Sequence, residues 1–192
     1  ELNGVDYIGL SSSELHGRNF DQETSRSAVG QPIGSFFVYE ADGLFQNDAE
    51  IQNYKNDRGE LLQPNAKPGD IRFKDLNGDG VINSDDRDFK GNPLPDCSMG
   101  LTLGFNYKNF DVSAFFQGVF GNEVYNLTNY LGEFYNQAQY NKNSTILDAW
   151  RPDNTDTDIP RVTLDDPNNN IRPSTYYIHN ASFVRLKNLK VG

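Results

Sequence analysis

The segment Met99 to Gly121 reads MGLTLGFNYKNFDVSAFFQGVFG. Apolar residues, with Gly118 among them, occupy every second position on both sides of Lys108-Asn109, and this period of two is typical of β-strands. Two such runs of about ten residues, joined by two residues, predict a tight antiparallel hairpin. We therefore expect the chain to be mainly β, with short helices.

This alternation fits two different environments. Strands of this length, apolar on one face and mostly polar on the other, occur in transmembrane barrels. They also occur in soluble sheets that bury one face against a core. Because the barrel pattern is weak for any one strand, alternation alone favours the soluble sheet and leaves both interpretations open.

The segment Asp75 to Asp86, DLNGDGVINSDD, has the spacing of a calcium loop. Oxygen-bearing side chains stand at its first, third, fifth and ninth positions, and a carboxylate stands at the twelfth. Calcium is a hard cation that takes six to eight oxygen ligands, and this spacing can wrap them around one point. The predicted ligands are Asp75, Asn77, Asp79, the carbonyl oxygen of Val81, Asn83, directly or through water, and Asp86.

Three residues indicate what kind of calcium site to expect. Gly80 stands at the sixth position, where the chain has to turn sharply, and Ile82 at the eighth is expected to anchor the loop to the core. Asp86 replaces the longer Glu of a helix-loop-helix hand, and the segment before the loop is strand-like. We predict a structural calcium loop rather than a sensor, with an acidic turn that binds no metal as the alternative.

The chain divides into segments around these two motifs. We interpret it as a calcium-type loop with a Pro-rich turn at 69–98, the hairpin at 99–121, a long loop with short helices at 122–175, and a strand at 176–192. The pattern upstream predicts a strand at 35–40, a turn at Asp42-Gly43, a helix at 48–58 capped by Asp48, and a strand at 70–74.

Two helices are expected within the long loop. Residues 122–140 keep helical spacing of apolar residues, although a polar loop fits them equally well. A second helix is capped by Asn143 or Ser144 and ends before Pro152. Its apolar face is predicted to consist of Ile146, Leu147 and Trp150.

The composition excludes several classes of protein. The chain has 192 residues and a formal net charge of −10, which argues against nucleic acid as a partner because phosphate binding needs a basic surface. A single cysteine, Cys97, rules out an internal disulfide. The sequence has no apolar run long enough for a transmembrane helix and no signal peptide at its start. Because it also stops within a strand-like segment, we expect a fragment of a longer protein.

The sequence carries no enzyme signature. His16 and His179 stand far apart, in no metal-ligand or triad pattern, and nucleophile elbows, phosphate loops and dinucleotide fingerprints are missing. We therefore expect that the chain is not an enzyme. Aromatic residues interleaved with Asn and Gln are able to stack on sugar rings, to pack within a loop, or to form a girdle at a membrane surface. These are Tyr125, Tyr130, Phe134, Tyr135 and Tyr140.

Several segments, taken in order, resemble the SusC/RagA family of TonB-dependent outer-membrane transporters. The resemblance begins with GDIRFKDLNGDGVI at 69–82 and continues through Asp86, GNPLP at 91–95, Gly100 and the hairpin. It then includes WRPDN at 150–154, IPR at 159–161 and ASFVRLKNL at 181–189. Together these matches cover roughly residues 30–192, and their order and spacing make the resemblance specific.

The resemblance implies a fold and a function. Members of the family are bacterial outer-membrane barrels with an N-terminal plug, and they import glycan oligosaccharides or peptides with energy from the TonB complex. A SusD-type surface lipoprotein forms their lid. On this basis the chain is expected to be part of the barrel domain near its C-terminal end, made of antiparallel hairpins and long extracellular loops, without plug or TonB box. The alternative is a soluble, calcium-stabilised, β-rich glycan-binding module.

Overall fold

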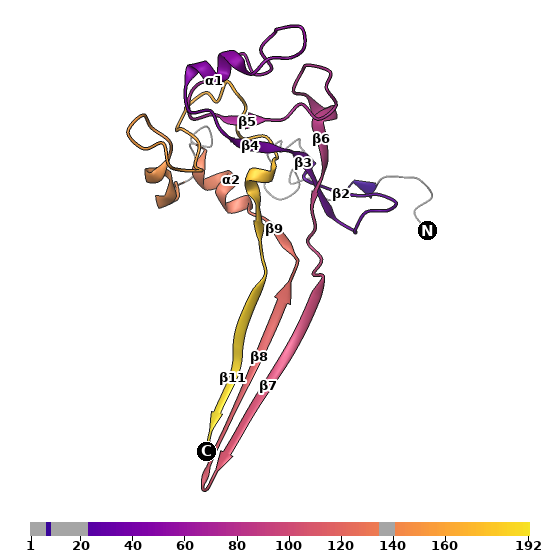
Figure 1. The fold of residues 1–192 in the computed structure, drawn as a ribbon, viewed down its shortest axis with the longest axis vertical. Coiled ribbons are helices and arrows are strands. Elements are labelled where there is room, and N and C mark those ends of the chain that lie inside the picture. The colour runs from indigo at the N-terminus through magenta and orange to yellow at the C-terminus, as the bar shows by residue number, and fades with distance from the viewer. Residues whose placement is uncertain (1–6, 9–22, 135–140) are drawn as a thin grey trace.

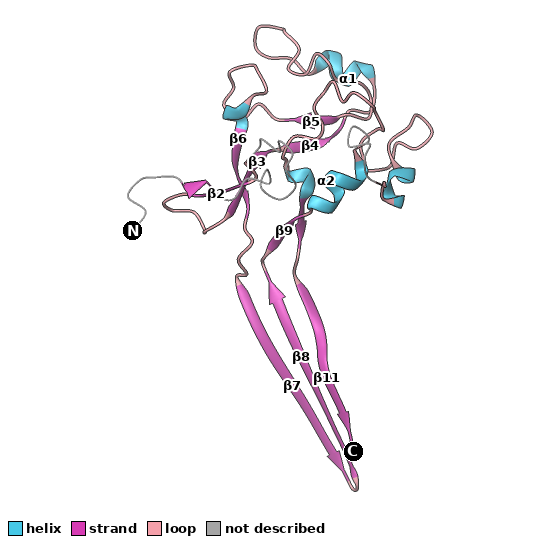
Figure 2. Ribbon diagram, turned by 180° about the vertical axis from the view of Figure 1, so that it is seen from behind, coloured by secondary structure: helices cyan, strands magenta, loops and turns pink. Residues whose placement is uncertain are grey.

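The computed structural model describes residues 7–8, 23–134 and 141–192, and it has two parts (Figure 1). A long, narrow three-stranded sheet, which we call the long sheet, extends away from a loop-rich part that we call the head. The head comprises the described residues outside β7, β8 and β11. The view from behind shows that helices occur only in the head (Figure 2). Within the described residues, no helix is long and apolar enough to cross a membrane.

The long sheet consists of β7 (Cys97–Tyr107), β8 (Phe110–Phe120) and β11 (Phe183–Val191). Its strand order is β11-β8-β7, and both pairings are antiparallel. The turn between β7 and β8 is Lys108-Asn109, and Lys108 adopts a φ of 54°. The predicted hairpin and the mainly β fold class are therefore confirmed.

Short strands organise the head. One sheet has the order β1-β2-β3-β6, and two further pairs are β4 with β5 and β9 with β10. Their bounds are β1 Tyr7–Ile8, β2 Ser25–Ser27, β3 Ser35–Tyr39, β4 Ala41–Leu44, β5 Ile71–Phe73, β6 Arg87–Gly91, β9 Glu123–Tyr125 and β10 Ile178–Asn180. The predicted strands at 35–40 and 70–74 correspond to β3 and β5.

The predicted turn at Asp42-Gly43 is wrong. Both residues lie within β4, which pairs with β5 through a shift of register between Ala41 and Leu44. Gly43 adopts a φ of 76°, so the glycine accommodates an irregularity inside a strand rather than a reversal of the chain.

The helices are shorter than their patterns predict. They are α1 (Asp48–Asn53), α2 (Leu127–Glu133) and 3-10 turns at Ser84–Asp86, Ser144–Asp148 and Thr175–Tyr177. The N-cap of α1 is Asn47, not Asp48, because the Asn47 side chain accepts a hydrogen bond from the Glu50 amide at 3.0 Å. The expected apolar face near residue 146 is also wrong. Leu147 is 72% exposed, whereas Trp150 lies beyond the end of the 3-10 turn and is buried.

The core of the head brings together residues that are far apart in sequence. Its buried members are Leu44, Ile71, Phe73, Phe134, Trp150 and Tyr177. The aromatic rings pack at tilted and edge-on angles, as for Tyr177 with Phe134 at 6.1 Å between centroids. The head therefore has a hydrophobic core of its own, and the long sheet projects from it (Figure 1).

Candidate functional site

The long sheet carries a continuous apolar face that no described residue covers. Residues opposite each other in neighbouring strands point to the same side, so the pairings of Phe116 with Leu101 and with Leu186 extend one face across all three strands. Leu101 is 54% exposed and Phe105 is 64% exposed. The face is formed by Met99, Leu101, Leu103, Phe105, Tyr107, Phe110, Val112, Ala114, Phe116, Phe120, Val184, Leu186, Leu189 and Val191.

A β-bulge keeps this face apolar along β11. Leu186 pairs with Phe116, whereas Asn188 pairs with the next residue of β8, Phe115, so that Lys187 is the extra residue. Without the bulge, the period of two would place Asn188 on the apolar face and Leu189 on the other face. The bulge therefore shifts the alternation of β11 by one residue, and this shift keeps Leu189 and Val191 on the apolar face.

The opposite face of the long sheet is mostly polar. It carries Ser98, Thr102, Asn106, Asp111, Ser113, Gln117, Arg185, Asn188 and Lys190. The exceptions are Val119 and Phe183 near the head and Phe115, whose ring lies over Gly100, 3.0 Å from where a Cβ atom of that glycine would be. A sheet with two exposed faces of opposite character fits a boundary between an apolar phase and water.

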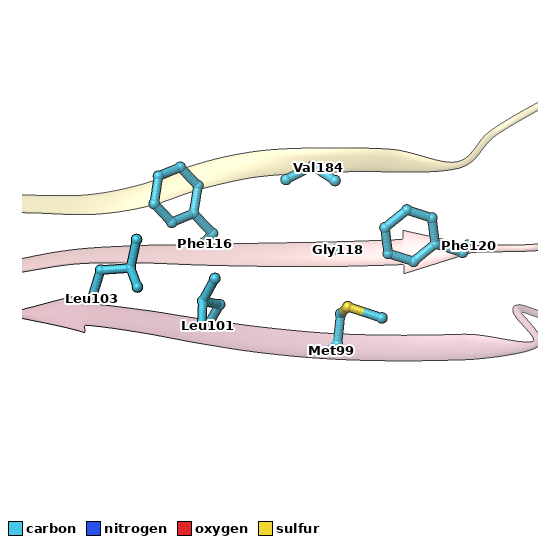
Figure 3. A pocket seen from close by; sticks show the side chains of 7 residues that line it. All are labelled: Met99, Leu101, Leu103, Phe116, Gly118, Phe120 and Val184. Carbon is cyan, nitrogen blue, oxygen red and sulfur yellow. The ribbon is translucent and has the colours of Figure 1, made fainter.

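The apolar face has a hollow of about 320 Å³ beside Gly118. Figure 3 shows Gly118 between Phe116 and Phe120 on the middle strand, with Met99 and Leu101 on one side and Val184 on the other. All of its lining is apolar, so the hollow offers no group for hydrogen bonding to a polar ligand.

The calcium-type loop is held together by side chains that accept hydrogen bonds from its own backbone. The Asp75 carboxylate accepts from the amides of Gly78 at 2.7 Å and Gly80 at 2.8 Å. The Asp86 carboxylate is fully buried and accepts from the amides of Leu76 at 2.8 Å and Asn83 at 2.7 Å. Both ends of the predicted ligand set are therefore fixed in position.

Three predicted ligands meet at the exposed side of this loop. The Asp79 carboxylate accepts from the side-chain amides of Asn77 at 3.1 Å and Asn83 at 3.3 Å. The amide of Val81 donates to the same carboxylate at 2.8 Å, and this backbone hydrogen bond is the main reason why the pKa of Asp79 lies below its usual value. Ile82 packs against the core, which confirms its predicted role as an anchor.

The loop does not gather its carboxylates around one point. Across residues 7–8, 23–134 and 141–192, no group of three or more His, Cys, Asp or Glu side chains is placed to hold a metal ion. The side-chain amide nitrogens of Asn77 and Asn83 donate to the Asp79 carboxylate, and the carboxylates of Asp75, Asp79 and Asp86 all accept hydrogen bonds from backbone amides. Calcium binding therefore stays a prediction.

A buried polar network beside this loop was not predicted. Asp70 is fully buried, and the Arg161 guanidinium donates to both of its carboxylate oxygens, at 2.6 Å and 3.2 Å. Gly69 allows this contact, because with a φ of 88° a Cβ atom there would stand 2.5 Å from Trp150 and 2.8 Å from Arg161. The IPR and GD motifs of the resemblance thus meet in space.

Three buried amide side chains extend this network to β5. Asn170 donates to Asp70 at 2.9 Å and accepts from the backbone amide of Ile71 at 2.8 Å. Gln63 and Asn168 both donate to the Ile71 carbonyl oxygen, each at 3.0 Å. No local pattern links residues 91 to 100 positions apart, so only the motifs of the resemblance pointed to Asp70 and Arg161.

The predicted aromatic set is used for packing where the structure describes it. Tyr125, Tyr130 and Phe134 all pack at tilted angles against the buried Tyr177. Tyr135, Tyr140 and His16 lie outside the described residues. His179 lies in β10, paired with Val124 of β9.

Comparison with known proteins places this architecture in context. The chain is 35% identical over its full length to TonB-dependent receptor P26 of Formosa agariphila, of which it covers 18%. It is 29% identical over 97% of its length to TonB-dependent receptor SusC of Bacteroides thetaiotaomicron, of which it covers 16%. The structure of the RagAB peptide transporter matches 88% of the chain with a TM-score of 0.59 and 27% identity, over 17% of that chain. No protein-family model matches. The chain thus spans less than a fifth of these relatives.

Proposed function

Since the chain is a segment of a SusC/RagA-like TonB-dependent transporter, we propose that its long sheet forms part of the wall of an outer-membrane barrel. The exposed apolar face carries this proposal. It would contact lipid, while the polar face lines the interior, as in other transmembrane barrels. The alternative of a soluble glycan-binding module would leave this whole face in water, which is unfavourable for so large an apolar surface.

The length of the strands supports the same proposal. β7 and β8 have 11 residues each, and β11 has 9. A tilted transmembrane strand needs about 9–11 residues to cross the hydrocarbon layer. The two outer strands would pair with further strands of the whole protein, because an unpaired edge is not tolerated in lipid.

The whole protein would then be an importer in the bacterial outer membrane. We propose that it takes up glycan oligosaccharides or peptides with energy from the TonB complex and works with a SusD-type surface lipoprotein. The similarity to SusC, a TonB-dependent receptor, and to the RagAB peptide transporter supports this proposal. The head would form loops on the extracellular side. Uptake of labelled oligosaccharides and peptides by cells with and without the whole protein tests this, and unchanged uptake of both would contradict it.

Spin labels on alternate residues of β7 test the proposed barrel wall. Single cysteines are introduced at Leu101, Leu103 or Phe105, and for comparison at Thr102 or Asn106, in the whole protein in lipid bilayers. The exposed native Cys97 is replaced by serine. We expect high access of oxygen to labels on the apolar face, and high access of a water-soluble nickel complex to labels on the polar face. Equal access to both faces would overturn the proposal.

We also propose that the calcium-type loop binds calcium as a structural ion. The side chains of Asn77 and Asn83 already contact Asp79 through their amide nitrogens, and the carboxylates of Asp75 and Asp86 lie at the two ends of the loop. The side-chain oxygens of these five residues and the Val81 carbonyl oxygen would turn to the ion and hold it, and the ion would cross-link the loop.

Calorimetric titration of the whole protein with calcium tests this proposal. We expect that Asp79→Asn weakens binding, because it removes the carboxylate at the centre of the set. Asp57→Asn is a matched control, since Asp57 is also exposed but lies outside the loop. The absence of a binding heat, together with a thermal unfolding curve that is the same in calcium and in chelator, would contradict a calcium site.

A further inference from the structure

A small cavity lies where three loops of the head meet. Its volume is about 220 Å³, and its lining includes Pro64 and Asn65, Val81 and Ile82 of the calcium-type loop, and Pro167 and Arg172. Gln63 and Asn168 also line it, so the walls combine proline and aliphatic side chains with polar ones, and Arg172 is the one cation among the lining residues. We call this space the Arg172 cavity.

The guanidinium of Arg172 is fixed in place but carries unused donors. It stacks 4.5 Å from the ring centroid of Phe73 and 5.1 Å from that of Tyr39. Its Nε donates to the carbonyl oxygen of Asn169 at 3.1 Å and its Nη2 to that of Asn168 at 3.0 Å. A guanidinium has five N–H groups, so these two hydrogen bonds leave three N–H groups that donate to no other residue in the described part of the chain.

No carboxylate among the described residues forms an ion pair with Arg172. The negative charges of Asp166 and Asp86 act on Arg172 and favour its charged form, but both carboxylates accept hydrogen bonds from other groups. Asp166 accepts from the amides of Asn170 and Ile171, and Asp86 accepts from amides of the calcium-type loop. Burial outweighs them and lowers the pKa of Arg172. A partly buried guanidinium without a paired anion is costly, and a carboxylate ligand would relieve that cost.

We propose that the Arg172 cavity binds the carboxylate of a small organic ligand. A carboxylate is planar and matches the fork of the guanidinium, whereas a doubly charged phosphate would be repelled by the nearby Asp86 and Asp166. The proline and aliphatic part of the lining suits the carbon skeleton of such a ligand, and the polar part suits a ligand that also carries hydroxyl or amide groups. Exposed Asn65 stands at the rim, where its side-chain amide is able to donate a second hydrogen bond. The carboxylate belongs either to the end of a peptide-like chain or to a sugar acid, and both present the same group.

The proposal does not depend on the membrane position of the long sheet, because the Arg172 cavity lies entirely in the head. Its test is a titration of the whole protein followed by saturation-transfer NMR. The probes are N-acetylglycine and glucuronate, with N-acetylglycinamide and glucose as their neutral counterparts. We expect saturable binding of at least one carboxylate and weaker binding of its neutral counterpart, and the probe that binds distinguishes the two sources.

Substitutions of lining residues test whether the carboxylate binds in the Arg172 cavity. We expect Arg172→Gln to weaken carboxylate binding about tenfold or more, since hydrogen bonds to charged groups contribute about 1.5–3 kcal/mol, and Arg172→Lys to weaken it less. Asn65→Asp adds a negative charge at the exposed rim and should also weaken binding, without disturbing the stacked guanidinium.

Two controls keep the test decisive. Asn53→Asp makes the same exchange at an exposed position of α1, outside the cavity, and should leave binding unchanged. If Arg172→Gln does not fold, the affinity of Asn65→Asp for the carboxylate shows whether the ligand binds in the Arg172 cavity. Carboxylate binding that is absent, or that is as strong in Asn65→Asp as in Asn53→Asp, would overturn the proposal.

Discussion

The head and the long sheet place their apolar and charged residues in opposite ways. In the head, Phe73 is fully buried and Asp70, a charged residue, is buried beside it. In the long sheet, Phe110 is 66% exposed. The head thus carries its own core and satisfies its buried charge internally. The long sheet is stable only if something outside the described residues covers its apolar face.

The stability of the head and that of the long sheet therefore have different sources, which are internal contacts for the head and the surroundings for the long sheet. Substitutions in the head should act through internal contacts, whatever surrounds the protein. Substitutions in the long sheet should depend on the medium and on the face that is changed. The four predictions below test this contrast, beginning with the largest expected effect.

Asp70→Ala should destabilise the head by about 3–5 kcal/mol, because removal of one partner leaves the Arg161 guanidinium without its buried counter-charge. Asp42→Ala is the matched control, since it breaks an exposed ion pair with Arg72 that should contribute at most about 1 kcal/mol. Hydrogen exchange of the β5 amides measures both effects. Equal loss of protection in the two variants would contradict the proposed importance of the buried pair.

Leu101→Arg should destabilise the protein in a bilayer by about 2–4 kcal/mol, because it places a charge on the apolar face near the middle of β7. Thr102→Arg, one residue later, points to the polar face and should be tolerated. Urea unfolding of the whole protein in phospholipid vesicles compares the two. A larger loss for Thr102→Arg would mean that the faces are assigned the wrong way round.

Gly69→Ala should cost about 1–3 kcal/mol, because the added Cβ atom would overlap Trp150 and Arg161. Gly59→Ala is a control for backbone conformation alone. Gly59 has a similar positive φ of 80°, but a Cβ atom there meets nothing within 4 Å. Chemical denaturation measures the free energy of unfolding of both variants, and the difference between them is the steric contribution. An equal loss of stability in both variants would mean that this contribution is absent.

Glu40→Gln should have the smallest effect, less than about 1 kcal/mol at neutral pH. Hydrogen bonds from Lys74 and Lys90 lower the pKa of Glu40 in the folded protein. This contribution is therefore present above the unfolded-state pKa of about 4.5 and disappears as the pH falls through the folded-state value. Stability curves of the native and variant proteins should converge in acid, and a difference that grows there would contradict this assignment.

The hairpin could be predicted from the sequence because its signal is local. Alternation and a two-residue turn lie within 99–121, so no distant residue was needed to find β7 and β8. The boundaries of helices were less accurate. Asn47 displaced Asp48 as the N-cap, since neighbouring residues with capping side chains compete and the structure selects one of them.

The arrangement of the head could not be predicted because its contacts are distant in sequence. The Asp70 and Arg161 ion pair, the amide network and the Arg172 cavity each combine loops that carry no common pattern. The calcium-type loop illustrates the same limit. Its spacing places oxygens at suitable positions along the chain, but in the fold the carboxylates of Asp75, Asp79 and Asp86 all accept hydrogen bonds from backbone amides.

The Asp70 and Arg161 ion pair also has a consequence for the order of folding. The two residues are 91 positions apart, and the whole β7-β8 hairpin lies between them. The head therefore cannot close during synthesis until both strands of the hairpin have been made. Once it closes, it holds the start of β11 near the end of β8, which shortens the loop that has to be closed when β11 pairs. The head would then act as a template that sets the register of the last strand.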